Sequence, residues 1–510
     1  MRNSAKKETV IASATKQTIA RELLELLCLA LVLWGLGYFF LKGGNFHRSE
    51  PPAQFVDTNA AEGARAALCG TPSPDGRAVV VEMAYSDEKG AWVEFAADRF
   101  SRLCPNIQVR LTALPDIEAV SLILKGELRP TLWAPTDEIS LRYFEQRFRE
   151  QEHRAPFQDK DKTELLSSPL VLLIWQDRLR VLSTILREER SEEGSWVRGQ
   201  CARIPRDPVM DRLPVEQMVP GSWGDWYAPL LNLSGLPNSL AMSKLPSRAE
   251  RRAVAVRPIG DVPMPPLAEI QSWGRVKIEH ARPTRDSAGA AALYLMAYDY
   301  LLPPSERDAV AAAMPETSGQ ARALQESLAQ RLETNFAERK PSLRKWLQRC
   351  EAGLESSSRT VSGLTTSLLD LGPSRYDGVV TYEHLALPFL ERADQHSGAL
   401  QKLVIVYPKP LLVARHPAVL LDGDAAQKDA AERWLRFLQS REMQEKGIDW
   451  GFRPINPAVH LQAYSSPQNR FLRLRRYGVL LQPHLSEAPR ANGHLLNEII
   501  ALWGEVTGRN

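Results

Sequence analysis

The chain has 510 residues, and its 64 Lys and Arg residues nearly balance its 61 Asp and Glu residues, leaving a net charge of +3. Hydrophobic residues make up 44% and charged residues 25%, which excludes a disordered chain, a collagen-like fibre and a disulfide-dense miniprotein. A mean hydropathy of −0.29 with one long apolar run excludes a polytopic membrane protein. The even charge balance gives no reason to expect a nucleic-acid partner.

The long apolar run lies at 23–41 and reads LLELLCLALVLWGLGYFFL, with Glu25 as its one charged residue. At about 1.5 Å per residue it nearly spans a bilayer core of about 30 Å. Basic residues are concentrated before the run, at Arg2, Lys6, Lys7, Lys16 and Arg21. Because positive charge stays cytoplasmic, we expect a cytoplasmic N-terminus at 1–22, an inner-membrane signal anchor at 23–41, and a body on the periplasmic or extracellular side.

A cleaved signal peptide is the alternative to an anchor. The apolar run is longer than a typical signal-peptide core, and no small-x-small cleavage site follows it, so the pattern favours the uncleaved form. Residues 42–76 are rich in Pro, Ala, Gly and Asp, which indicates a tether between the membrane and the body.

Four cysteines lie outside the anchor, at Cys69, Cys104, Cys201 and Cys350, and none forms a C-x-x-C pair. Cys69 precedes a predicted strand, and Cys104 follows the helix that returns from it. The two residues should therefore meet at one sheet edge, which predicts a Cys69–Cys104 disulfide and, by elimination, a Cys201–Cys350 disulfide. Four buried thiols remain the alternative.

The body reads as α/β. Strands are predicted at 78–85, 106–111 and 130–133, with helices at 90–103 and 117–125 between them, and this alternation is typical of a parallel sheet covered by helices. A fully apolar strand at 169–175 suits burial on both faces. The chain from 183 to 275 has no clear pattern.

The second half continues the alternation. It predicts strands at 277–279, 378–382, 403–407 and 418–421, a strong helix at 288–302, and added helices within 306–351. Asp424 should cap a further helix, and Gly447 should end it.

Sequence signatures of catalysis are absent. The chain has no phosphate loop, no H-E-x-x-H, no G-x-S-x-G and no G-x-G-x-x-G after a strand. The spacing S-x-x-K occurs at Ser86/Lys89 and Ser342/Lys345, but without the S-D-N and K-T-G triplets that accompany it in penicillin-binding enzymes. We therefore expect no enzyme, no metal and no cofactor.

Polar residues gather where predicted strands lead into helices: Ser86-Asp87, Asp286-Ser287 and Tyr382-Glu383. In open α/β sheets this is where ligands bind, and helix starts present free N–H groups. Helix capping explains the same Ser and Asp residues, and for a single junction it is the favoured interpretation.

Several blocks, taken in order, carry a resemblance to a family. They are VVVEMAYSDEKGAWVEFAADRF, GELRPTLWAPTDE, SSPLVLLIW, PTRDSAGAAALYLMAY, YDGVVTYEHLAL, IVYPKPLLVARHPAVLLDG and RWLRFLQSREMQEKGIDWGFRPINP. The set resembles bacterial extracellular solute-binding proteins with the type II periplasmic-binding-protein fold, in the branch similar to molybdate-binding proteins. The likeness covers about 79–459, and 183–275 and 306–351 match poorly.

The resemblance implies two α/β lobes. Lobe one comprises 77–167 and 411–510, lobe two comprises 176–402 with its insertions, and hinge crossings lie at 168–175 and 403–410. A ligand would bind between the lobes, which close on it. Carried across, the ligand-binding residues are Ser86, Asp87, Trp133, Arg285, Asp286, Ser287, Tyr382 and Glu383.

This chain departs from the family at the ligand loops. Carboxylates at Asp87-Glu88 and at Asp286 disfavour an oxyanion unless Arg285 or Arg359 offsets them, so a polar organic solute is as plausible as an anion. We expect a membrane-anchored solute-binding protein that serves an ABC-type permease. The alternative is a degenerate binding-protein fold that acts as a sensing or interaction module for another envelope protein, with Trp223 and Trp226 as docking residues.

Overall fold

The computed structural model describes residues 67–71, 76–188, 233–235, 265–302, 319–351, 360–395, 403–483 and 487–509. Within these ranges no helix is both long and apolar enough to cross a membrane. The expected anchor at 23–41, the partner cysteine Cys201 and the tryptophans Trp223 and Trp226 lie outside the described residues. Residues from Val56 to Asn510 form one compact unit.

The first sheet has five strands in the order β2 (Ile107–Leu114), β1 (Val79–Ser86), β3 (Leu132–Ala134), β10 (Pro417–Leu420) and β4 (Lys162–Glu164). Strands β1, β2 and β3 run parallel, as the alternation of strands and helices predicts. Strand β10 returns from the far end of the chain and runs antiparallel to both of its neighbours.

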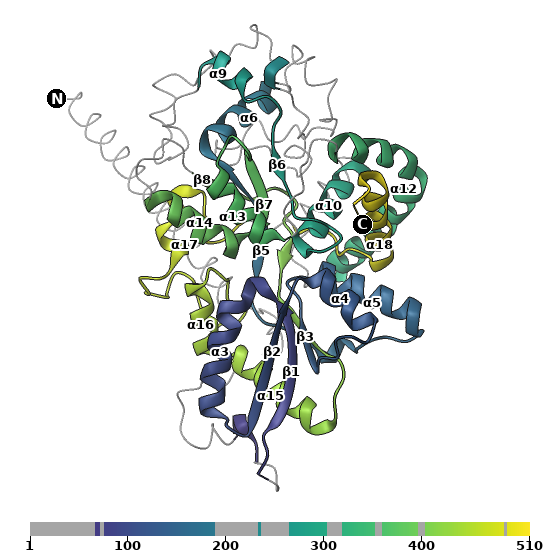
Figure 1. Ribbon diagram of the computed structural model, residues 1–510, viewed down its shortest axis with the longest axis vertical. Helices are drawn as coiled ribbons and strands as arrows, with labels where there is room; N and C mark the ends of the chain where they lie inside the picture. The colour runs from purple at the N-terminus through teal and green to yellow at the C-terminus, as the bar shows by residue number, and fades with distance from the viewer. Residues whose placement is uncertain are drawn as a thin grey trace, which may run out of the picture. The chain divides into compact units, whose positions relative to one another are not determined.

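Helices cover both faces of this sheet (Figure 1). On one face, α3 (Gly90–Leu103) and α15 (Ala425–Leu438) place Trp92, Phe100 and Trp434 against Met83. On the other face, α4 (Asp116–Leu124) and α5 (Glu138–Glu152) complete a smaller core. Asp424 caps α15 through Gln427 N at 2.8 Å, as predicted.

The predicted helix end at Gly447 is wrong. Helix α15 ends at Leu438, and Gly447 lies inside the next helix, α16 (Arg441–Asp449). A Cβ at Gly447 would lie 2.8 Å from Leu166 Cδ2. The glycine therefore allows α16 to approach the connection between β4 (Lys162–Glu164) and β5 (Ser168–Trp175) closely, which sequence reading confuses with a helix stop.

The second sheet has the order β6 (Ile278–Glu279), β7 (Gly378–Tyr382), β5 (Ser168–Trp175) and β8 (Leu403–Val406), and β9 (Val413–Ala414) pairs with the start of β5. Strand β5 is buried along its whole length. It runs antiparallel to both β7 and β8, so the parallel arrangement predicted for the body does not extend across this sheet.

Helices α6 (Gln176–Glu188), α13 (Val361–Leu371) and α14 (Glu383–Gln395) pack around the second sheet. The same cores contain residues from the last fifth of the chain, including Val459, Phe471, Leu474, Tyr477 and Val479. This packing differs from the expected division, in which all of 411–510 belongs to lobe one. Chain position alone does not decide which sheet a late loop covers.

A layer of helices joins the two halves (Figure 1). The C-terminal helix α18 (Gly493–Thr507) packs against α5, which follows the first sheet, and against α10 (Ser287–Leu301) and α12 (Gly319–Glu351), which belong with the second. A Cβ at Gly493 would lie 2.6 Å from Arg142 O, so α18 begins in close backbone contact with α5.

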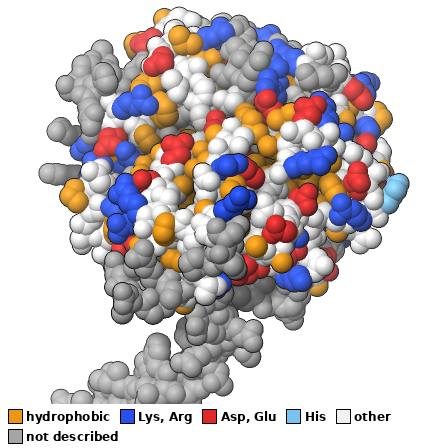
Figure 2. Space-filling view, turned by 60° about the horizontal axis from the view of Figure 1, so that its bottom comes forward, with side chains coloured by type: hydrophobic (Ala, Val, Ile, Leu, Met, Phe, Trp, Pro, Cys, Tyr) orange, Lys and Arg blue, Asp and Glu red, His pale blue; other side chains and the backbone are white. Residues whose placement is uncertain are grey.

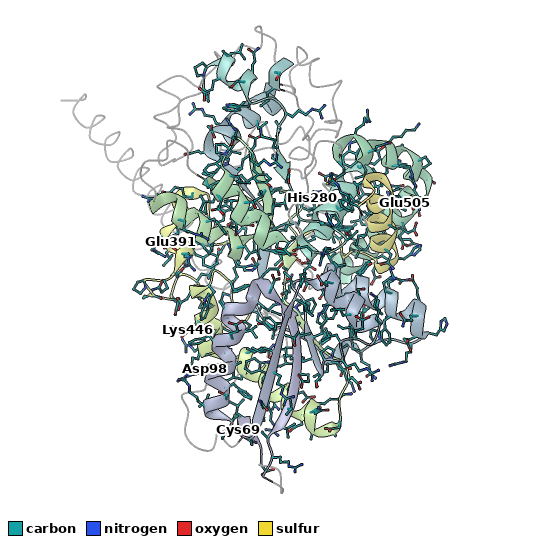
Figure 3. The ribbon with its side chains drawn as sticks, in the orientation of Figure 1. Cys69, Asp98, His280, Glu391, Lys446 and Glu505 are labelled. Atoms are coloured by element: carbon teal, nitrogen blue, oxygen red, sulfur yellow. A yellow bond between two sulfur atoms is a disulfide. The ribbon has the colours of Figure 1, made fainter. Side chains whose placement is uncertain are left out.

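The cysteine prediction is confirmed at one pair. Cys69 and Cys104 form a disulfide with a Cα–Cα distance of 5.0 Å, and Cys69 lies at the end of the first sheet away from the second (Figure 3). Cys350 is also disulfide-bonded. Charges of both signs are interspersed over the face in Figure 2, without a large field of one sign.

A glycine in α10 tests the close packing of the helical layer. A Cβ at Gly289 would lie 2.2 Å from Ala281 O, which is backbone and cannot move aside. We expect Gly289→Ala to lower the free energy of unfolding by about 1 to 3 kcal/mol, as overpacking does, in urea titrations followed by circular dichroism. Gly90→Ala is the matched control, because a Cβ at Gly90 would meet nothing closer than 3.7 Å. We expect this substitution to raise the free energy of unfolding by about 0.5 to 1 kcal/mol. Equal effects of the two substitutions would contradict the clash.

Candidate functional site

The polar residues predicted from the sequence meet where the two sheets face each other. Strand β1 ends at Ser86, α10 begins at Ser287, and β7 ends at Tyr382. Each of these three side chains is at most 1% exposed. The carboxyl ends of strands from both sheets therefore contribute to one buried polar cluster, as strand ends do in open α/β folds.

Lys89 lies at the centre of this cluster and is fully buried. Its ammonium donates to Ser86 Oγ, to Ala134 O at 2.7 Å and to Pro135 O at 3.0 Å, which uses all three of its hydrogens. It thus connects the ends of β1 and β3. Burial lowers the pKa of Lys89 to about 8, although nearby carboxylates, Asp116 first among them, oppose that shift.

A tyrosine links the two halves. Tyr382 OH donates to Asp137 Oδ2 at 2.6 Å and lies 3.1 Å from Ser287 Oγ. Asp137 precedes α5 on the first sheet's side, while Tyr382 ends a strand of the second sheet. Burial raises the pKa of Asp137 to about 6, and burial with the Asp137 charge raises the pKa of Tyr382 well above its usual value.

The helix starts in this cluster are occupied by the chain's own carboxylates. Asp137 Oδ1 accepts from Ser140 N at 3.0 Å at the start of α5. Asp286 accepts from Ala288 N at 2.8 Å in α10 and from Val361 N at 2.8 Å in α13. The capping interpretation thus holds for Asp286, whereas Ser86 makes no capping hydrogen bond.

Two further acidic groups complete the ring of carboxylates. Asp116 Oδ2 accepts from Thr136 N at 2.9 Å, and Glu88 accepts from Thr136 Oγ1. Burial raises the pKa of Asp116 and Glu88, and it raises that of Asp286 to about 7. Helix starts can bind an anionic ligand, but here carboxylates of the chain already occupy these positions. The cluster therefore favours a neutral or cationic ligand group.

Two buried histidines lie beside Lys89. The rings of His384 and His416 are 5.4 Å apart, and each contacts Phe452. His384 Nδ1 lies 2.9 Å from Ser168 Oγ. Burial and the Lys89 charge lower the pKa of His384 to about 3 and lower that of His416 as well, so both rings are neutral at physiological pH.

The other predicted site residues lie elsewhere. Trp133 packs edge-on to Phe144 at 5.1 Å, in the core beneath α4 and α5. Glu383 is held by Arg453 at 2.6 and 2.7 Å, so it ties α14 to the G-F-R-P-I-N-P block. Asp87 is exposed.

Arg285 pairs with Glu118 of α4 and so adds a second contact between the halves. The residues that sequence reasoning missed are Asp116, Thr136, Asp137, His384 and His416. Asp116 and Asp137 carried a usable signal, because each stands at the start of a helical pattern.

The cluster is filled by the protein's own side chains. Lys89, Asp116, Asp137 and Asp286 are each at most 2% exposed, so a ligand reaches them only when the halves separate. A hollow of about 60 Å³ lies nearby, lined by Glu138, Ile139, Glu164, Leu411–Val413, Arg415 and Glu487–Ala491. In the described ranges, no group of three or more His, Cys, Asp or Glu residues is arranged to hold a metal ion.

The family comparison agrees with the resemblance noted in the sequence. Residues 283–453 match the model of the family described as "Bacterial extracellular solute-binding protein". The match spans 171 of the 510 residues, about a third of the chain, and that family is one of binding proteins. The match does not single out the molybdate-binding-like branch. No curated protein matches the chain.

Several solved structures are distantly similar to the chain. The periplasmic binding protein AfuA from Actinobacillus pleuropneumoniae, with fructose-6-phosphate bound, is 11% identical, covers 84% of this chain and 99% of its own, and has a TM-score of 0.43. The ferric binding protein from Campylobacter jejuni is 10% identical with the same coverages and TM-score. The sulfate-binding protein SubI from Mycobacterium tuberculosis H37Rv is 12% identical, covers 74% and 88%, and has a TM-score of 0.37.

Removing the buried ammonium tests whether Lys89 holds the cluster together. Lys89→Met leaves Ala134 O and Pro135 O without their donor and the carboxylates without their counter-charge. We expect the free energy of unfolding to fall by about 3 to 5 kcal/mol in urea titrations at pH 7.5. Lys446→Met is the control, because Lys446 is 43% exposed and pairs with Asp449 at 3.2 Å, and its loss should cost less than about 1 kcal/mol.

The same pair of variants gives a pH prediction. Because the pKa of Lys89 is lowered to about 8 in the fold, the unfolded chain binds more protons above pH 8. The wild-type free energy of unfolding should therefore rise relative to that of Lys89→Met between pH 8 and pH 10. A difference that stays flat or shrinks over this range would show that Lys89 is not buried as described.

Proposed function

We propose that the protein is a membrane-anchored, extracytoplasmic solute-binding protein that captures a small polar ligand between its two lobes for an ABC-type permease. One observation carries the proposal: Ser86 and Asp137 on one side and Ser287 and Tyr382 on the other converge in a single buried polar cluster. The family match over residues 283–453 supports it.

The cluster indicates the ligand's chemistry. Hydroxyls of Ser86, Ser287 and Tyr382 supply donors and acceptors, and the carboxylates outnumber the single ammonium of Lys89. An oxyanion would have to displace Asp137 or Asp286 from a helix start. A polar organic solute, neutral or with a cationic group, is therefore favoured over an anion.

Ligand entry requires the halves to part. Opening breaks the Tyr382–Asp137 hydrogen bond and the Arg285–Glu118 pair, and it exposes carboxyl groups whose pKa values burial had raised. A ligand that satisfies Tyr382 and Asp137 together would restore the lost contacts. Closure around a solute then stabilises the folded protein by mass action.

The expected anchor and the disulfide support the proposed compartment. The apolar run at 23–41 and the basic residues before it support a cytoplasmic N-terminus and an extracytoplasmic body. The Cys69–Cys104 bond supports the same side, because disulfides persist in oxidising compartments.

Fractionation tests the anchor. We expect the full chain to stay in the membrane pellet after alkaline carbonate extraction, because the proposed anchor at 23–41 would hold it in the bilayer. The chain beginning at Val56 should be recovered in the supernatant. Release of the uncleaved full chain by carbonate would contradict an integral anchor, and a mature N-terminus beyond residue 41 would show cleavage instead.

A thermal-shift screen of the 56–510 unit tests solute capture. The panel holds oxyanions, sugars, amino acids, peptides and polyamines. A ligand at about 100 times its dissociation constant should raise the free energy of unfolding by about 2.7 kcal/mol. We expect a hit among polar organic solutes that is lost in Ser287→Ala and in Tyr382→Phe. Tyr294→Phe is the matched control, because Tyr294 OH is equally buried but donates to Pro489 O at 2.7 Å, outside the cluster.

A second function has its own supporting observation. The cluster is filled by internal contacts, and α18 packs on both α5 and α12, with Lys340 2.5 Å from Glu498. These contacts favour a protein that stays closed and acts as an envelope interaction or sensing module. A 56–510 unit that melts cooperatively but responds to no solute in the panel would support this function over solute capture.

A further inference from the structure

A short amphipathic segment near the C-terminus presents arginines and leucines on its outer side. It comprises α17 (Arg470–Arg473) and the 3-10 turn η7 (Arg475–Tyr477). Phe471, Leu474 and Tyr477 face inward and are at most 4% exposed. The intervening residues Leu472, Arg473, Arg475 and Arg476 are exposed. Residues three and four apart share a side of a helical turn, so Leu472 lies beside Arg475 and Arg476.

Leu480 extends the same surface. Arg453 lies over the Phe471 ring at 5.0 Å and donates to Leu480 O at 2.5 Å and to Leu481 O at 2.9 Å. This guanidinium therefore holds the chain after the turn next to α17. We call the exposed set Leu472, Arg473, Arg475, Arg476 and Leu480 the arginine–leucine surface.

The charge of this region is one-sided. Residues 451–486 contain five arginines and no Asp or Glu. Arg453 is paired with Glu383, and Arg470 and Arg473 share a single carboxylate, Glu391 of α14, at 2.9 and 2.6 Å. A positive charge thus remains on the arginine–leucine surface, in contrast to the balanced charge of the whole chain.

The leucines distinguish this surface from an ordinary solvated basic face. Four large hydrophobic side chains are exposed in the described part of the chain, and two of them belong here: Leu472 at 38% and Leu480 at 45%. Arginines with adjacent exposed leucines fit the headgroup region of a bilayer, where charge meets lipid phosphate and apolar side chains enter the acyl boundary.

We propose that the arginine–leucine surface docks the body onto the anionic lipid surface of the membrane that anchors it. This inference rests on the proposed anchor: the expected tether at 42–76 has 35 residues, a reach of at most about 120 Å when fully extended. The tether keeps the body at high effective concentration near the bilayer, so a weak surface affinity suffices. Docking would fix which side of the body faces the membrane.

Vesicle sedimentation tests the proposal on the 56–510 unit, which lacks the anchor and so reports the surface alone. We expect it to pellet with vesicles of equal parts phosphatidylglycerol and phosphatidylcholine at 0.1 M salt, and not with pure phosphatidylcholine. Each arginine near an anionic surface contributes roughly a fivefold factor in partitioning, so Arg475→Ala/Arg476→Ala should bind roughly 25-fold more weakly.

The matched control carries the same charge change elsewhere. Arg147→Ala/Arg149→Ala removes two exposed arginines of α5, which is labelled on the opposite side of Figure 1 from α17. Figure 3 likewise places Glu391, the partner of Arg470 and Arg473, on the other side from Glu505 of α18. This control should change partitioning by less than about twofold, and all variants should keep the wild-type melting temperature.

Two outcomes would overturn the proposal: no sedimentation of the folded 56–510 unit with anionic vesicles, or an equal loss in both double variants. Neither outcome bears on the anchor or on solute capture, which the carbonate extraction and the thermal-shift screen decide. At 0.5 M salt, where screening leaves the apolar contribution dominant, Leu472→Ser/Leu480→Ser should bind the vesicles more weakly than the wild-type unit does.

Discussion

A single buried ammonium organises the place where the two sheets meet. Lys89 has no solvent contact, and its three hydrogens go to Ser86 Oγ and to the carbonyls of Ala134 and Pro135. Around it stand carboxyl groups whose pKa values burial raises. Burying several carboxylates around one cation is costly, and hydrogen bonds from backbone N–H groups and hydroxyls to each carboxylate offset that cost. The positions of α5 and α10 follow from these bonds.

This arrangement gives the S-x-x-K pattern at Ser86 and Lys89 a structural explanation. The serine and lysine are in contact, and the pKa of Lys89 is lowered, as an activated pair would require. Yet Ser86 is buried, and the lysine hydrogens are committed to backbone carbonyls. The pair is a structural bridge between two strands, which agrees with a family of binding proteins.

The family match covers only part of the buried polar cluster around Lys89. Residues 283–453 include Asp286, Ser287, Tyr382 and the Glu383–Arg453 pair, which together form the second sheet's contribution. Ser86, Lys89, Asp116 and Asp137 precede the match. The cluster therefore joins a segment that fits the family model to one that does not, and the helical layer with α12 and α18 reinforces that joint. The buried polar cluster that favours a ligand site between the lobes also holds the lobes together. Whether the lobes open therefore distinguishes solute capture from a closed interaction module.

The sequence by itself determined the local elements, and it carried a resemblance to solute-binding proteins that the family match over residues 283–453 supports. Alternating apolar patterns placed β1, α3, β2, α4 and β3 within a few residues, and the strand–helix order brought Cys69 and Cys104 to one edge. The capping residues Asp286 and Asp424 were readable for the same reason, since caps act within one helical turn. The three junction residues Ser86, Ser287 and Tyr382 were identified because strand ends in such sheets share one side.

Only the tertiary structure decided what these residues touch. Glu383 faces Arg453 rather than a ligand, Trp133 packs in the core, and Gly447 sits inside a helix against Leu166. The antiparallel course of β5, the placement of residues 459–479 with the second sheet, and the bond from Tyr382 to Asp137 all join residues far apart in the chain. Local periodicity reports which side of an element is apolar, but not which distant element covers it. That choice depends on packing and on the cost of leaving a buried charge unpaired.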